Sequence, residues 1–101
     1  MLIKFGTSLK DLAGEPIFLP DSKAPMTLES VSVASLVTLM QEDQSVDAKT
    51  KYDWGHLANQ IYGQKEFDVS TEQVVLLKNR IGKLYGPLIV VQTWDMLEGR
   101  G

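Results

Sequence analysis

His56 is the side chain best suited to chemistry, because it is the only histidine in the chain and imidazole titrates near neutral pH. Asp53 precedes it by three residues, so the two side chains would share one face of a helix. A general base also needs a nucleophile or an orienting group within reach, and a zinc site needs at least three protein ligands where this pair supplies two. We therefore interpret the pair as a contact on a helix surface.

The other polar residues do not complete a reactive site. The chain has no cysteine, and its serines lack the G-x-S-x-G elbow that exposes a nucleophile. Gly82 and Gly86 are not part of a phosphate-binding loop, because no Lys followed by Ser or Thr comes after them. The acidic loop (Glu42, Asp43 and Asp47) lacks the ligand spacing and central glycine of a calcium loop, and we expect it to be solvent-exposed. These residues predict a non-enzymatic protein without a cofactor or metal.

The aromatic residues favour binding over catalysis. Tyr52 and Tyr62 are amphipathic, and such side chains are enriched at the hot spots of protein interfaces. For Trp54 and Trp94 we expect a core position, with each indole N–H donating to a carbonyl or to water. The sequence therefore predicts a protein interface formed by Tyr52, Tyr62 and the acidic loop.

Composition narrows the class of partner. The net charge is −3, whereas binding to nucleic acid depends on clustered Lys and Arg. The densest basic cluster, Lys78, Arg80 and Lys83, alternates with an apolar stripe and is predicted to be the solvated face of a helix. No apolar run approaches the roughly 20 residues of a membrane span, and no secretory signal is present at the N-terminus. We expect a protein of the cytoplasm that binds protein, with no nucleic-acid or membrane partner.

The length of 101 residues predicts one domain over 1–101. In its first part, Leu2–Phe5 and Ile17–Leu19 are short apolar segments separated by turn residues, which predicts a β-hairpin over 1–20 with an open register. Pro20 and Pro25 then enclose a loop. The rest of the domain, 27–98, carries helical patterns.

The first two helices are marked by caps. Thr27 is a good N-cap for a helix that starts at Leu28. Ser45 offers the next cap, for a helix that runs to Tyr62 and is ended by Gly63. Both helices place apolar residues at the spacing of one buried face. The β-branched residues Val31, Val33, Val37 and Thr38 of the first would suit a strand nearly as well.

The third helix has two independent start signals. Ser70 and Gln73 form a capping box, and Val69 and Val74 occupy the two positions of a hydrophobic staple. The pattern continues to Leu84, so we expect a helix from Ser70 to that residue.

A fourth helix is expected to begin at Pro87 and to end at Gly99, although the run 88–91 would also suit a buried strand. Its inward residues would be Val90, Val91, Trp94 and Leu97. The predicted fold class is therefore mainly α (α+β), an N-terminal hairpin followed by about four short helices around one core. Residues expected to share that core are Leu36, Leu57, Val74, Leu77, Ile81, Leu84 and Trp94.

Several segments also resemble known proteins: 9–17 (LKDLAGEPI), 26–31 (MTLESV), 51–52 (KY), 69–78 (VSTEQVVLLK) and 81–92 (IGKLYGPLIVVQ). On these segments, which span most of the chain, it resembles a family of small proteins of tailed bacteriophages and prophages. Most members of that family are described only as hypothetical proteins. The resemblance implies a phage origin, and it carries no catalytic residues.

Two roles follow from these expectations. The favoured role is a structural or assembly accessory factor of the virion or its tail, which acts through protein surfaces. The alternative is a small phage inhibitor of a host enzyme or defence complex, because an acidic domain suits a basic target. Either protein would be found in the host bacterial cytoplasm, the first also within the virion, and homo-oligomerisation is left open.

Overall fold

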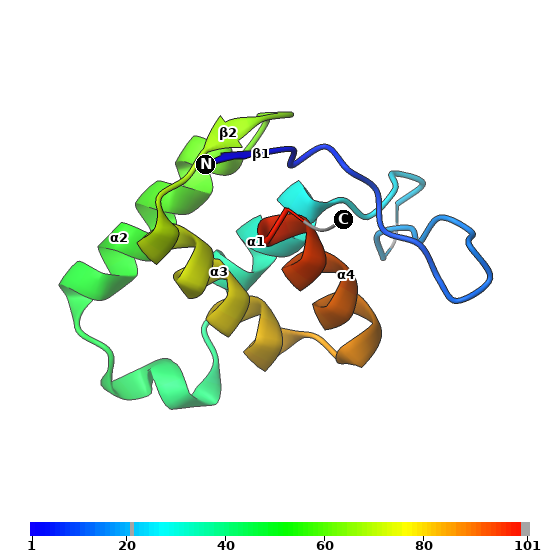
Figure 1. The fold of residues 1–101 in the computed structure, drawn as a ribbon. Coiled ribbons are helices and arrows are strands. Elements are labelled where there is room, and N and C mark those ends of the chain that lie inside the picture. Colours follow the sequence, from blue (N-terminus) through cyan, green and yellow to red (C-terminus); the bar gives the residue numbers. More distant parts are fainter. Residues whose placement is uncertain (21, 100–101) are drawn as a thin grey trace.

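Four α-helices and a two-stranded sheet make up this computed structural model, which describes residues 1–20 and 22–99 (Figure 1). The elements in chain order are β1 (Leu2–Ile3), α1 (Leu28–Val37), the 3₁₀ helix η1 (Gln41–Ser45), α2 (Ala48–Ile61), β2 (Phe67–Asp68), α3 (Thr71–Leu84) and α4 (Pro87–Leu97). Helix α1 packs against both α2 and α3, and α3 packs against α4. The predicted mainly helical class is confirmed.

The start of α3 is as its sequence predicts. The Ser70 hydroxyl accepts a hydrogen bond from the Gln73 N–H at 3.1 Å, and the Gln73 side chain accepts one from the Ser70 N–H at 2.9 Å. Val69 and Val74 are both buried beneath this capping box. The helix ends at Leu84, and the following chain enters α4, so the helical alternative for 88–91 is the correct one.

The predicted cap of α2 is wrong by two residues. Asp47 is the N-cap, and its carboxylate accepts from the Thr50 N–H at 2.9 Å. Ser45 instead ends η1, whose tight turn occupies the preceding residues. A carboxylate also interacts favourably with the positive end of the helix dipole, which favours Asp over Ser at this position. The far end agrees with expectation, because Gly63 has φ +79° just after the helix.

The predicted N-terminal hairpin is also wrong. Strand β1 pairs antiparallel with β2, with Leu2 opposite Asp68 and Ile3 opposite Phe67. Residues 4–20 and 22–27 lie in a long connection held by single bridges, in which Pro16 has no N–H to donate to a continuous ladder. The pairing of β1 with a distant strand buries Ile3 in the core.

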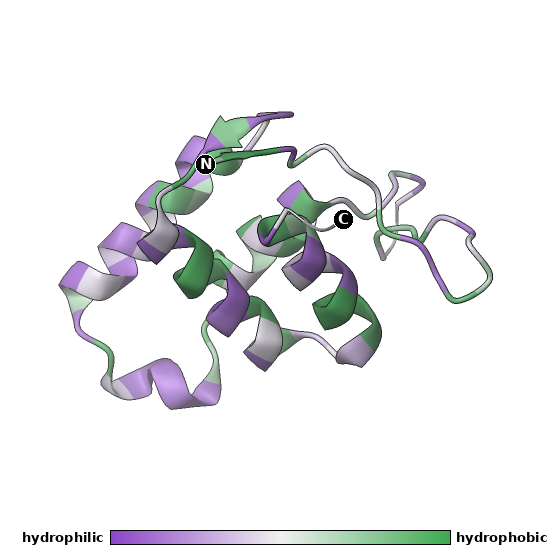
Figure 2. Ribbon diagram, in the orientation of Figure 1, coloured by the Kyte–Doolittle hydropathy of each residue, from purple (hydrophilic) through white to green (hydrophobic). Residues whose placement is uncertain are grey.

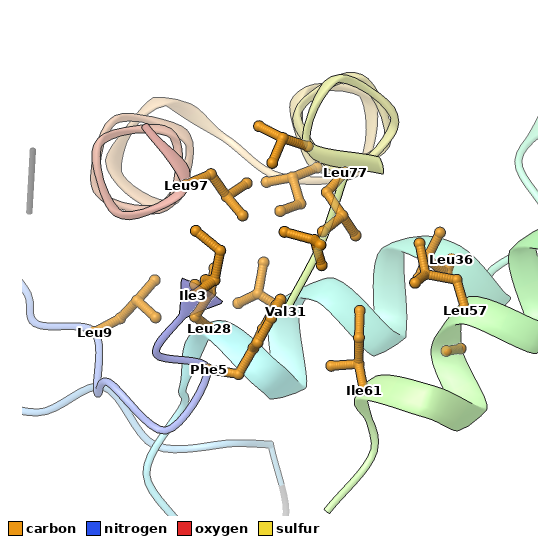
Figure 3. Packing of buried hydrophobic residues seen from close by; sticks show 14 residues of the cluster. Ile3, Phe5, Leu9, Leu28, Val31, Leu36, Leu57, Ile61, Leu77 and Leu97 are labelled. Carbon is orange, nitrogen blue, oxygen red and sulfur yellow. The ribbon is translucent and has the colours of Figure 1, made fainter. Parts of the chain in front are cut away.

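The core is single, as expected, and lies between α1 and the other helices (Figure 3). Figure 2 shows that hydrophobic residues are concentrated on α1 and α4. Of the residues predicted for the core, Leu36, Leu57, Val74, Leu77 and Ile81 are buried.

The inward face of α4 differs from its prediction. Val91 is exposed, and Thr93 is buried in its place beside the correctly predicted Leu97. The Thr93 hydroxyl can be buried because it donates to the Ile89 carbonyl at 2.8 Å. Leu84 and Trp94 are only half-buried, although the Trp94 indole donates to the Lys78 carbonyl at 3.1 Å, as expected of a buried indole.

Candidate functional site

An ion pair between Arg80 of α3 and Asp43 of η1 lies inside the domain, with both residues only 2% exposed. One guanidinium nitrogen donates to both carboxylate oxygens, at 2.8 and 2.9 Å. The other two nitrogens donate to the carbonyls of Ser35 and Thr38, at 3.0 and 2.9 Å. All three guanidinium nitrogens therefore have acceptors, and the end of α1 is tied to η1 and α3.

The Asp43 carboxylate is stabilised in its charged form. It accepts from the Met40 N–H at 2.9 Å, and this backbone hydrogen bond, followed by the contact with Arg80, holds the pKa of Asp43 below its ordinary value. Two expectations are thereby wrong: Arg80 does not belong to a solvated basic face, and Asp43 is not solvent-exposed. Burial is tolerated because each charge meets the other directly and the remaining polar atoms of Arg80 also have hydrogen-bond partners.

A groove that Asp43 helps to line lies between the end of α1 and the first half of α2. We call it the α1–α2 groove and define it by Val37, Leu39, Lys51, Trp54 and Gly55. The two aliphatic side chains are unusually exposed for their type, at 60% and 65%. The groove thus presents apolar surface to solvent beside an ammonium group.

The ring of Trp54 is held in place by contacts with Arg80 and with the core. The Arg80 guanidinium lies over its ring, 4.0 Å from the ring centroid, and the ring also packs against the hydrophobic core. A guanidinium that is already fixed by three acceptors gives the indole a rigid support. A fixed aromatic ring loses little conformational freedom when a partner binds, so this part of the groove is preorganised.

Gly55 has no packing reason to be glycine. It lies within α2, where glycine costs about 1 kcal/mol relative to alanine. A Cβ added at this position would meet nothing within 4 Å, and the backbone has no positive φ that requires glycine. Because Gly55 has no side chain, the groove stays open on its α2 side, and the helix is less stable than it would be with alanine at this position.

Both predicted interface tyrosines are exposed on α2 or at its end. Tyr52 lies one helical turn before Gly55, and its ring stacks on His56 with centroids 5.8 Å apart. Tyr62 lies seven residues after Gly55, two turns along a similar face. Neither tyrosine lines the groove: Tyr52 lies on the helix surface beside Gly55, and Tyr62 lies further along the helix.

The other polar residues that were predicted for an interface or a helix-surface contact lie at the surface. Glu42 and Asp47 are exposed near the groove, and Asp47 is engaged as the α2 cap. Asp53 pairs with Lys49 at 3.0 Å, so the expected contact between Asp53 and His56 is replaced by one partner for each. The sequence does not indicate Val37, Leu39 or Gly55 as residues of a binding groove, because no local pattern marks them as exposed.

A second hollow, between β1 and the end of α4, is larger but less suited to recognition. Its lining includes Leu2, Lys4 and Met96. It contains no aromatic ring and no buried polar side chain among its lining residues. Residues of these two kinds supply affinity and orientation at binding sites, and the α1–α2 groove has both.

Two classes of site have no counterpart in residues 1–20 and 22–99. No three acidic, histidine or cysteine side chains in these ranges are placed to hold a metal ion together. None of the helices described there is both long enough and apolar enough to cross a bilayer.

Comparisons of the chain with protein-family models, with curated proteins and with solved structures give no match.

Proposed function

We propose that this chain is a non-enzymatic phage or prophage protein that works through protein–protein contacts, as a structural or assembly accessory factor of the virion or its tail. The observation that carries the binding role is the α1–α2 groove, which is kept open by Gly55 although that residue weakens the helix. The phage context comes from the sequence resemblance.

Three properties of the groove support recognition of a protein. Val37 and Leu39 offer apolar area that a partner can remove from water. Trp54 is an aromatic anchor with a fixed ring, and the exposed Tyr52, one helical turn before Gly55, is a residue of the type found at hot spots. Lys51 adds a single positive charge, which gives the groove a preference for a partner with an acidic residue next to an apolar one.

A Gly55→Gln variant tests this role. Glutamine is a better helix former than glycine and its Cβ meets no atom, so the fold should be at least as stable as before. Its side chain would nevertheless stand in the groove and hinder a partner. The measurement is the amount of this protein in purified particles from a phage that carries the variant gene.

We expect the amount per particle to fall by about tenfold or more, which corresponds to a loss of roughly 1.4 kcal/mol in affinity. Gln60→Ala is the matched control, because Gln60 is exposed on the opposite side of α2. The proposal fails if wild-type protein is absent from particles and deletion of its gene leaves their number and infectivity unchanged. Capture of a host enzyme by the groove would then favour the inhibitor role.

A further inference from the structure

Leu12 is the most exposed large apolar residue in the described part of the chain, at 95%. It lies in the turn 11–15, which is rigid: the Asp11 carboxylate accepts from the N–H groups of Ala13 and Glu15 at 2.9 and 3.0 Å. Asp11 and Glu15 are also joined through their backbones at 2.8 Å. Gly14 supplies the positive φ, +84°, that the turn requires. The turn therefore holds a leucine side chain out in water.

The base of this turn is fixed to α4. The Lys10 N–H donates to the Gln92 side chain at 2.9 Å, and that amide donates back to the Lys10 carbonyl at 2.7 Å. Figure 2 shows a hydrophobic tip with hydrophilic residues on both sides. An apolar side chain on a rigid support can enter a pocket at low entropic cost, which makes the turn 11–15 a binding element.

The turn and the α1–α2 groove lie far apart on one molecule. Figure 1 shows the loop that contains the turn projecting at one side, and η1 with the first half of α2 at the other. The domain is elongated, with extents of 41, 28 and 22 Å. One chain therefore cannot place its own Leu12 in its own groove, but two copies can be joined in this way.

The charges of the two elements are complementary. Glu15 is exposed in the turn, and Lys51 is exposed at the groove. Neither forms an ion pair with any of the residues that the structure describes. A contact that brings Leu12 between Val37 and Trp54 would allow Glu15 to approach Lys51.

We propose that the α1–α2 groove receives the turn 11–15 of a second copy of this chain. The proposal rests on the proposed function and names the partner of the same groove. Such a contact is heterologous, because it joins two different surfaces, and repetition of it produces a ring or a filament. The contact area of one turn is small, so free copies associate weakly and assemble when they are concentrated on a particle.

Complementation between two variants tests the head-to-tail geometry. Leu12→Asp removes the inserted side chain, and Gly55→Gln blocks the groove; neither position is needed for the fold. The measurement is sedimentation velocity over a range of high protein concentrations. Wild-type protein should give a mass that rises with concentration, and each variant alone should stay at the 11.2 kDa of one chain.

An equimolar mixture of the two variants decides the matter. Each variant retains the surface that the other lacks, so the mixture contains one intact pair of surfaces and should form a dimer that does not grow further. If the mixture stays monomeric while wild-type protein associates, the contact is not between the turn and the groove. If either variant alone associates as wild type does, the proposal is also overturned.

A charge exchange provides an independent test. Lys51→Glu and Glu15→Lys should each weaken self-association about tenfold or more, and the double variant should recover most of it. Lys65→Glu makes the same charge change at an exposed position after α2 and should have little effect. Absence of recovery in the double variant would overturn the pairing of these two charges.

The two proposals fail separately. Wild-type protein that is monomeric at every concentration, with particle incorporation still lost in Gly55→Gln, would reject self-association and leave the groove with a different phage protein as its partner. Protein that self-associates in this way but is absent from particles, and whose gene is dispensable for them, would reject the virion role and leave the head-to-tail contact in place.

Discussion

Arg80 and Asp43 are 37 residues apart in the chain, yet they form a buried ion pair in which one guanidinium nitrogen lies 2.8 and 2.9 Å from the two carboxylate oxygens. This pair joins α3 to η1, and Arg80 also supports the ring of Trp54 from below. The same side chain therefore contributes to the fold and fixes one wall of the α1–α2 groove.

Removal of one charge from this pair should destabilise the domain. Asp43→Asn leaves the Arg80 guanidinium buried without a compensating carboxylate, so we expect a clear fall in Tm in a thermal denaturation experiment. Glu42→Gln is the matched control, because the neighbouring Glu42 is exposed and its contact with Lys83 is long, at 4.0 Å. A Tm for Asp43→Asn as high as that of the control would show that the pair contributes nothing to stability.

The same carboxylate predicts a direction of pH dependence. The pKa of Asp43 is lowered by folding, first by the Met40 N–H and then by Arg80, so the native state binds fewer protons than the unfolded state between the folded-state pKa and the ordinary pKa of 3.8. The resulting stability is complete above that value and is lost as the pH falls through the folded-state pKa. The pKa of Asp47 is also lowered, by its hydrogen bonds with Thr50, so this carboxylate too makes the protein less stable as the pH falls.

The measurement is the free energy of unfolding in urea from neutral pH into the acid range. In Asp43→Asn this acid loss should be smaller than in wild-type protein, with the part due to Asp47 still present. Identical slopes for the two proteins would contradict the lowered pKa of Asp43.

The centre of the core can be tested at Leu77, which is fully buried on α3 (Figure 3). Leu77→Ala should lower the free energy of unfolding by about 2 to 5 kcal/mol, because it removes apolar contacts and leaves a cavity. Leu12→Ala makes the same change at an exposed position and should change stability by no more than about 0.5 kcal/mol. Equal losses at the two leucines would show that the core is not centred where the structure places it.

Tyr52 tests the helix surface beside Gly55. Tyr52→Ala should reduce affinity for the partner by roughly 2 kcal/mol if the ring is a hot spot, and the fold should persist because the side chain is exposed. His56→Ala should have a much smaller effect, since His56 only stacks against Tyr52, and chelation of metal ions should have none. Loss of binding on either of these treatments, with Tyr52→Ala silent, would favour chemistry at His56 over recognition.

The parts of this fold that depend on near neighbours can be predicted from the sequence. The Ser70 capping box and the Val69 and Val74 staple involve residues within five positions of each other, and they form as expected. The pairing of β1 with β2 joins residues more than 60 positions apart, and no local pattern distinguishes that partner from the nearer segment 17–19.

The buried ion pair was missed for a different reason. Charged residues usually lie at the surface, so Arg80 was assigned to a solvated face. Its position three residues after Leu77 and four before Leu84 places it along the apolar stripe of α3, which is the signal that could have indicated its burial. Exposure of Val37 and Leu39 depends on how α1 meets α2, and therefore required the structure.

The most direct test of the central claim is photo-crosslinking in infected cells from a benzoylphenylalanine placed at Leu39 of the α1–α2 groove. Val75 on α3 is the matched control position, because it is also an exposed aliphatic residue, at 52% against 65%. We predict a discrete crosslinked protein from position 39, lost when Gly55→Gln is added, and none from position 75. Equal crosslinking from both positions, or crosslinking at 39 that persists with Gly55→Gln, would contradict the claim that this groove is the binding site.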